Sequence, residues 1–171
     1  MFGHLFNPHK LKYAMDARFK GAKEEPAECI LCSIVNQLEK VNSLEIYRTD
    51  KSVVSVNLYP FNTGHLMVFP IRHVEHIEDL TESEALDIHN LTVLAVKILK
   101  NEYKPGGFNI GYNLENASGA SIRHIHQHIV PRYENEMGYL DVISGTRVVV
   151  VDPVVVRDKL ICEFEKGTGH L

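Results

Sequence analysis

The chain has 171 residues, of which 44% are hydrophobic and 23% are charged, and it contains no long apolar run. These figures predict one globular domain and exclude a membrane span or a disordered tail. The formal charge of -4, from 18 Lys and Arg against 22 Asp and Glu, lacks the basic excess that nucleic-acid binding needs. We therefore expect neither a nucleic acid nor a membrane as partner.

The cysteine content indicates a cellular compartment, and the histidine content indicates a kind of chemistry. Three cysteines cannot form a closed set of disulfides, and the first ten residues lack the charged-then-apolar order of a secretion signal. Both features predict a reducing cytoplasm. The chain also has 10 histidines, which titrate near neutral pH and bind metals, so a cluster of them would indicate chemistry rather than packing.

The first half of the chain begins with an arm and continues with a helix and three strands. Residues 1–26 mix Pro, Gly and many charges, and predict an N-terminal arm that packs on its own domain or on a partner subunit. Residues 27–171 then form a single domain with a C-terminal extension. Apolar residues at helical spacing predict a helix over 29–40. Alternating segments at 44–49 and 52–58 predict a hairpin, followed by a strand at 65–71.

The second half contains the longest predicted helix. Thr81 and Glu84 form a capping-box pattern that opens an amphipathic run through Leu99, and Pro105 ends it. Strands are expected at 108–114 and 124–132, a Val-rich strand or helix start at 147–151, and a C-terminal helix at 153–165. The order predicts an α+β fold, with an antiparallel sheet of about five strands, two main helices and a C-terminal helix.

The strongest chemical signal is the alternation of His124, His126 and His128. Side chains alternate faces along a strand, so this spacing predicts that all three imidazoles lie on one face. A solvated polar face is the alternative, and three histidines in register disfavour it. The preceding small-residue loop contains Ser118, Gly119 and Ser121, whose hydroxyl and N–H groups could approach a phosphate. Together the two features suggest phosphoryl or nucleotidyl transfer with an imidazole nucleophile.

A second signal is the pair Cys29 and Cys32 in a CxxC spacing. A zinc site would need two further ligands, for which His73 and His124 are candidates. Buried free thiols are nearly as good an interpretation. A redox dithiol is less favoured, because the chain lacks a βαβ setting. Cys162, alone in an apolar helix, is interpreted as a core residue.

These residues carry a resemblance to a known family. HIHQHIVP resembles the signature of the histidine-triad (HIT) family, and VNLYPFNTGHLMVFPIRHVEHIEDL resembles that family's first half. The opening LFNPHKLKYA with CILC, the GYNLENASGAS loop and SGTRVVVVDPVVVRDKL are most similar to the branch that contains diadenosine tetraphosphate phosphorylases. The resemblance spans nearly the whole chain and implies a HIT-like fold for residues 27–171.

The resemblance also implies roles for individual residues. His126 would be the nucleophile that forms a nucleotidyl-histidine intermediate, and His128 would assist the leaving group. His124 would be a structural partner or a ligand of a structural zinc with the CxxC pair and His73. The implied substrate-binding residues are Asn57 for the ribose, His65 in support of the catalytic histidines, and Asn113, Ser118, Gly119 and Ser121 for phosphate. A homodimer and a divalent metal arriving with the polyphosphate are further implications.

Two positions depart from the family pattern. Gln127 replaces an apolar residue between the second and third histidines and needs a hydrogen-bond partner if it faces a helix. Ala120 stands where hydrolase branches place a polar residue, which favours phosphate over water as acceptor. Hydrolysis of dinucleoside polyphosphates, nucleoside phosphoramidates or adenylated small molecules is the alternative. A non-catalytic nucleotide-binding protein and a metal-storage protein are less favoured.

Overall fold

Hydrophobic alternation and capping produce the elements of a small α+β domain. The computed structural model describes residues 29–38, 41, 43–134, 136 and 151–168, so the predicted 1–26 arm and most of the Val-rich 147–151 segment lie outside them. In chain order the elements are α2 (Ile30–Val35), β1 (Glu45–Arg48), β2 (Ser52–Val56), β3 (Leu66–Pro70), η2 (Ile77–Asp79), α3 (Glu82–Tyr103), β4 (Gly107–Tyr112), η3 (Asn116–Ser118), β5 (Gln127–Arg132) and α5 (Pro153–Thr168).

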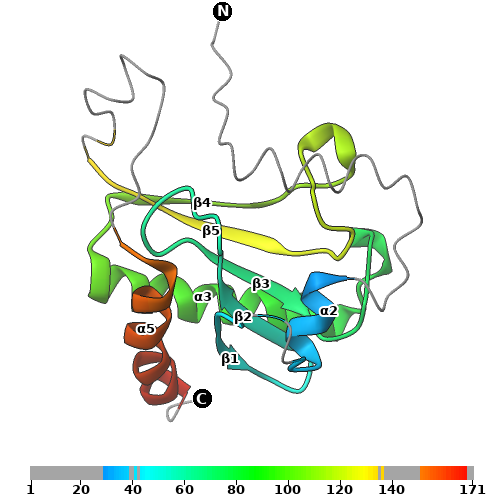
Figure 1. Cartoon of the computed structure of the whole chain (residues 1–171), viewed down its shortest axis with the longest axis horizontal. Helices are drawn as coiled ribbons and strands as arrows, with labels where there is room; N and C mark the ends of the chain where they lie inside the picture. Colours follow the sequence, from blue (N-terminus) through cyan, green and yellow to red (C-terminus); the bar gives the residue numbers. More distant parts are fainter. Residues whose placement is uncertain (1–28, 39–40, 42, 135, 137–150, 169–171) are drawn as a thin grey trace, which may run out of the picture.

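The five strands form one antiparallel sheet in the order β1-β2-β3-β5-β4 (Figure 1). The predicted hairpin is present, because β1 pairs with β2 across Asp50 and Lys51. β5 is the last of the described strands in sequence yet lies between β3 and β4, where Met67 and Gly111 are both opposite His128 in the register. The predicted α+β class and antiparallel sheet are confirmed.

Alternation along β2 and β3 sends apolar side chains to both faces of the sheet. On one face Val54 and Val68 pack with residues of α3 and α5, including Leu99 and Phe164. On the other face Val53, Met67 and Phe69 pack with Cys29, Leu31 and Ile34 around α2. The sheet therefore separates two hydrophobic clusters, and each β5 side chain points toward one of them.

The long helix α3 begins where the capping box predicts. The Thr81 hydroxyl accepts from the Glu84 N–H, and the Glu84 carboxylate accepts from the Thr81 N–H. Arg72 adds two hydrogen bonds to that carboxylate, and this pairing lowers the pKa of Glu84 to about 2. The helix ends at Lys104, whose left-handed backbone stops it just before Pro105.

Two predicted boundaries differ from the structure. The helix expected over 29–40 is the short α2, because Gln37 adopts a left-handed backbone (φ 52) that ends it. The strand expected over 124–132 begins only at Gln127. In the segment before it, the Ile125 N–H donates to the Val74 carbonyl instead of joining the ladder. Among the described residues, no helix is long and apolar enough to cross a membrane.

Candidate active site

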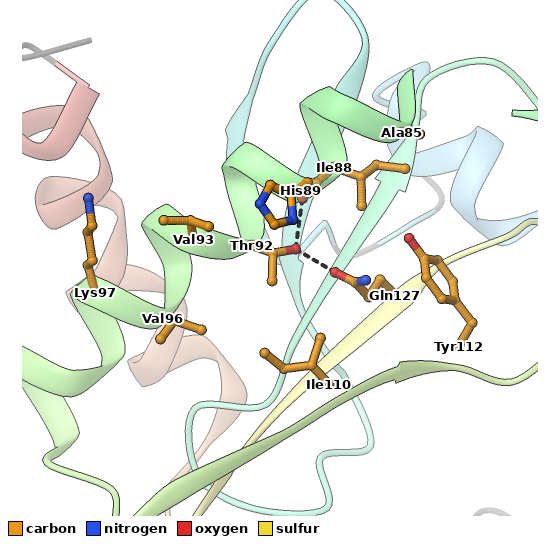
Figure 2. A pocket seen from close by; sticks show the side chains of 10 residues that line it. All are labelled: Ala85, Ile88, His89, Thr92, Val93, Val96, Lys97, Ile110, Tyr112 and Gln127. Atoms are coloured by element: carbon orange, nitrogen blue, oxygen red, sulfur yellow. Dashed lines mark hydrogen bonds between the residues drawn. The ribbon is translucent and has the colours of Figure 1, made fainter. Parts of the chain in front are cut away.

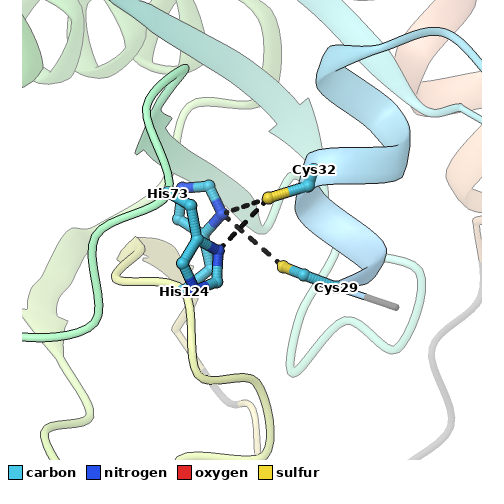
Figure 3. A group of neighbouring side chains, drawn as sticks. All are labelled: Cys29, Cys32, His73 and His124. Atoms are coloured by element: carbon cyan, nitrogen blue, oxygen red, sulfur yellow. Dashed lines mark hydrogen bonds between the residues drawn. The ribbon is translucent and has the colours of Figure 1, made fainter. Parts of the chain in front are cut away.

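Two thiols and two imidazoles from three distant segments converge at one end of the sheet. Cys29 and Cys32 come from the start of α2, His73 follows β3, and His124 precedes β5 (Figure 3). Their ligand atoms all lie within 4.8 Å of one another. The Cys32 Sγ lies 3.2 Å from His73 Nδ1 and 3.5 Å from His124 Nδ1, and Cys29 Sγ lies 3.6 Å from His124 Nδ1. Sulfur and nitrogen ligands of tetrahedral zinc lie roughly 3.3–3.8 Å apart, so these spacings suit a metal ion.

The outer contacts of the two imidazoles leave their Nδ1 atoms available to a metal. His124 Nε2 donates to the Pro70 carbonyl at 2.9 Å, and His73 Nε2 lies 3.6 Å from the Glu75 carboxylate. An acceptor on the far nitrogen fixes the tautomer of a metal-binding histidine. Burial lowers the pKa of His124 to about 4, so the ring is neutral at pH 7, as a ligand must be.

The thiols complete a donor set of two sulfurs and two nitrogens. Cys29 and His124 are buried, while Cys32 and His73 are half-buried. Burial, together with the nearby Cys29, raises the pKa of the Cys32 thiol to about 12. Binding of a cation would release that proton and remove the cost of burying a thiolate. Residues Cys29, Cys32, His73 and His124 can therefore hold a metal ion, with no position left for water.

His126 is buried and held by one of its two ring nitrogens. Its Nδ1 lies 2.7 Å from the backbone carbonyl of His124. A carbonyl can only accept, so Nδ1 carries the proton and the lone pair of the neutral ring is on Nε2. Burial lowers the pKa of His126 from its ordinary value, against the carbonyl contact that raises it. At neutral pH this imidazole is neutral, and Nε2 is the nitrogen whose lone pair is available.

His128 is paired with His65 across β3 and β5. His65 accepts from the Phe61 N–H at Nδ1 (3.1 Å), so its proton is on Nε2, which lies 3.0 Å from His128 Nδ1. His128 accepts there and carries its own proton on Nε2. The His126 and His128 rings meet edge to face with centroids 4.8 Å apart. One ring thus presents a lone pair and its neighbour a proton.

The three triad histidines lie on the α2 side of the sheet, since His128 is opposite Met67 and His124 packs on Phe69, but their contacts differ. His124 belongs to the metal cluster, where its ring lies 5.0 Å from that of His73, and only His126 and His128 contact one another as rings. The backbone of 122–126 is irregular before β5 begins, and it places the His124 ring beside the CxxC pair without changing its side of the sheet.

The residues expected to bind substrate lie in two loops. Asn57 follows β2 and its Oδ1 accepts from the Tyr59 N–H. Asn113 follows β4 and is half-buried. The small-residue loop holds Ser118, Gly119 and Ser121, all exposed. Ser118 donates to the Glu115 carbonyl at 2.9 Å, so this hydroxyl stabilises the turn of the loop itself. The loop leads directly into the histidine segment, and its phosphate-binding role stays a prediction.

A hollow of about 570 Å³ lies on the opposite side of the sheet, between α3 and β4 (Figure 2). Its floor is Gln127, whose Oε1 accepts from the Thr92 hydroxyl of α3. This contact supplies the partner that a glutamine at this position was expected to need. Most of the other lining side chains are apolar, including Val93 and Ile110, which are 41% and 46% exposed, and His89, Lys97 and Tyr112 also line it.

Comparison with known proteins identifies the family. The HIT domain model matches residues 39–135, which is more than half of the chain. The chain belongs to the HIT family. An AP-4-A phosphorylase of Mycobacterium tuberculosis is 34% identical to it over 158 residues, which are 90% of this chain and 78% of the relative. An asymmetrical bis(5'-nucleosyl)-tetraphosphatase of Schizosaccharomyces pombe is 32% identical over 131 residues, 77% of this chain and 63% of the relative.

Solved structures agree on the HIT fold. A Zn-bound histidine triad family protein from Mycobacterium smegmatis superposes with a TM-score of 0.70 at 19% identity, over 86% of this chain and 100% of that one. The family resemblance and the HIT-like fold inferred from the motifs are thus confirmed.

Sequence reasoning about this HIT domain missed three contributors and misplaced one residue. The sequence did not predict three contacts: Phe61 with His65, Glu75 with His73, and the Pro70 carbonyl with His124. An aromatic residue four positions before a site histidine was the available signal for Phe61. Cys162 is exposed rather than part of the core. It lies on the opposite side of α5 from Leu160 and Phe164, which the helical period already implied.

Proposed function

We propose that this protein transfers a nucleotidyl group from a dinucleoside polyphosphate, such as diadenosine tetraphosphate, to inorganic phosphate. The observation that carries the proposal is the hydrogen bond from His126 Nδ1 to the His124 carbonyl, which leaves the Nε2 lone pair for attack on phosphorus. The names of the phosphorylase and the tetraphosphatase relatives support the same substrate class.

In the first step, His126 Nε2 forms a bond to the α-phosphorus and the bond to the bridging oxygen breaks. The leaving group is ATP when diadenosine tetraphosphate is the substrate, and the Nε2–H of His128 faces its departing oxygen. In the second step, a phosphate oxygen attacks the adenylyl-imidazole, the N–P bond breaks, and ADP is formed. Splitting one displacement into two lowers each barrier, and donors around the phosphate stabilise its developing charge.

The other predicted residues bind the substrate in this scheme. Asn57 holds the ribose, Asn113 contacts phosphate, and Ser118, Gly119 and Ser121 surround the polyphosphate, which brings its own divalent metal. His65 supports His128 through their 3.0 Å contact.

We further propose that Cys29, Cys32, His73 and His124 hold a structural zinc. A closed set of two thiolates and two imidazoles is the donor chemistry of structural zinc, which fastens segments together without touching the substrate. The residues do the positioning: His124 joins the cluster through its side chain and holds His126 through its carbonyl. Thiols of this kind suit a reducing cytoplasm, the location that we propose.

The test is a product analysis with diadenosine tetraphosphate, with and without phosphate. ADP plus ATP, formed only when phosphate is present, is the expected result. AMP plus ATP in both conditions would instead indicate hydrolysis with water as acceptor, the activity that the name of the S. pombe relative suggests. The absence of any turnover that depends on His126 would exclude both reactions.

A homodimer is proposed at the α3 and β4 side of the sheet. β4 is an edge strand in the described sheet, and the apolar hollow with Val93 and Ile110 lies beside it. A second copy would cover this surface and extend the sheet. Sedimentation at micromolar concentration should give a dimer for the natural chain and a monomer for Ile110→Glu. A natural chain that sediments as a monomer would contradict the proposal.

A further inference from the structure

An exposed aromatic ring covers a fully buried histidine beside the candidate active site. The Phe61 side chain is 46% exposed, whereas His65 beneath it has no exposed surface. The two rings are stacked, with centroids 5.0 Å apart and planes 22° from parallel, and the Phe61 ring also lies 6.2 Å from that of His128. One face of the ring is therefore directed at the histidine pair.

The backbone of the same residue contacts the same histidine. The Phe61 N–H donates to His65 Nδ1 at 3.1 Å. A ring turned over about its Cβ–Cγ bond would present a carbon to that N–H and remove Nε2 from His128. Phe61 thus opposes the flipped ring in two ways, through a hydrogen bond at the edge and through stacking on the face.

The loop between β2 and β3 that carries Phe61 is fastened to β5 independently of this contact (Figure 1). The Asn62 amide donates to the Pro131 carbonyl at 2.8 Å, and the Tyr133 hydroxyl donates to the Thr63 carbonyl at 2.9 Å. Gly64 follows in a left-handed backbone (φ 82), where a Cβ would approach Leu99 to 3.2 Å. The backbone that follows Phe61 is accordingly fixed by contacts that do not involve the Phe61 ring.

We propose that Phe61 is a positioning residue that fixes the orientation and tautomer of His65, and through His65 the protonated Nε2 of His128. The expected effect of Phe61 on turnover rests on the proposed function. Its effect on the orientation and tautomer of the two imidazoles does not. A leucine at this position would keep the N–H and much of the apolar volume, but it would remove the stacked ring, which is one of the two restraints against a flip of His65.

The kinetic test compares Phe61→Leu and Phe61→Tyr with the natural protein, using diadenosine tetraphosphate and phosphate. In Phe61→Leu, kcat should fall about tenfold while KM stays within about twofold, because a proton donor acts in the transition state and not in binding. Phe61→Tyr keeps the ring and should retain the natural kcat. The matched control is Tyr59→Leu, the same type of change two residues away in the same loop and at similar exposure, 41%.

An unchanged kcat in Phe61→Leu, or an equal loss in Tyr59→Leu, would overturn the proposal. A second measurement needs no turnover: nitrogen NMR of protein labelled at histidine. His65 and His128 should each show a single Nε2–H tautomer in the natural protein, and mixed tautomers in Phe61→Leu. An Nδ1–H on His65 in the natural protein, or unmixed tautomers in Phe61→Leu, would contradict the inference. A protein with these tautomers but no turnover would instead contradict the proposed function alone.

Discussion

His124 and His126 are two residues apart and both buried, yet their surroundings place the ring proton on opposite nitrogens. His124 donates from Nε2 to the Pro70 carbonyl and turns Nδ1 toward two thiols. His126 donates from Nδ1 to the carbonyl of His124 and keeps its lone pair on Nε2. Burial lowers the pKa of both, so both are neutral at pH 7. The two rings differ in which nitrogen donates to a backbone carbonyl, and on this difference rest the proposed roles of His124 as a metal ligand and His126 as a nucleophile.

The sharpest test of this comparison replaces His126. His126→Ala should lower kcat for diadenosine tetraphosphate on the order of 10⁴-fold, because the covalent route is lost. The metal content should be unchanged, since the His126 side chain contributes no atom to the cluster. Product formation and zinc per chain, measured on one preparation, test both halves. Retention of a tenth of the activity would contradict a nucleophilic role for His126.

The second largest effect is expected on the metal side. Cys32→Ser should lose zinc and reduce the free energy of unfolding by about 3 kcal/mol or more, because the metal ion would no longer join the three segments that carry its ligands. Chemical denaturation and metal analysis are the measurements. Cys162→Ser is the matched control, an exposed cysteine outside the cluster, and should change neither. Equal stability of the two variants would show that the cluster carries no structural metal.

Glu75 offers a finer test of the same comparison. Its carboxylate lies 3.6 Å from His73 Nε2 and also 4.0 Å from Arg123. Glu75→Gln should weaken zinc affinity about tenfold by replacing the charged outer acceptor of one ligand with a neutral one. Turnover at saturating zinc should stay at the natural level. Competition with a chelator gives the affinity, and a loss of turnover at saturating zinc would show that Glu75 acts on the nucleophile side.

The smallest effect is expected on the far face of β5. Thr92→Val removes the hydroxyl that Gln127 accepts from, and should reduce stability by about 1 kcal/mol. Zinc content and tautomers should not respond, because Gln127 points to α3 while its neighbours point to the site. If kcat falls under conditions where Thr92→Val is fully folded, the two faces of β5 are coupled.

Local sequence rules predicted much of the fold for identifiable reasons. The Thr81 and Glu84 capping box located the start of α3, because both of its hydrogen bonds form within four residues. Asp50 and Lys51 located the hairpin between two alternating segments. The same rules placed Leu86 in the apolar run of α3, yet it is 61% exposed while Ile88 is buried. Helical spacing alone does not reveal where the covered face ends.

The candidate site was less predictable, because its decisive contacts are between distant residues. The spacing of Cys29 and Cys32 suggested a metal, but only the fold brings His73 and His124 to them across 41 and 92 positions from Cys32. The period of two predicted one face for the triad. All three rings lie on the α2 side of the sheet, but the backbone before Gln127 bonds to Val74 rather than to a strand, and His124 contacts the thiols instead of the other two rings. The Phe61 contact could not be derived, since it depends on how a loop folds over His65.

The register of β5 has a consequence for how such a chain can vary over evolution. His128 lies opposite Met67 and Gly111, and Gln127 lies opposite Val68 and Tyr112, with paired strands on both sides. Insertion or deletion of one residue in β5 would exchange the faces of histidine and glutamine and disrupt both ladders at once. We therefore expect homologous chains to differ along this segment by substitution only, and to accumulate changes of length in the loops around it.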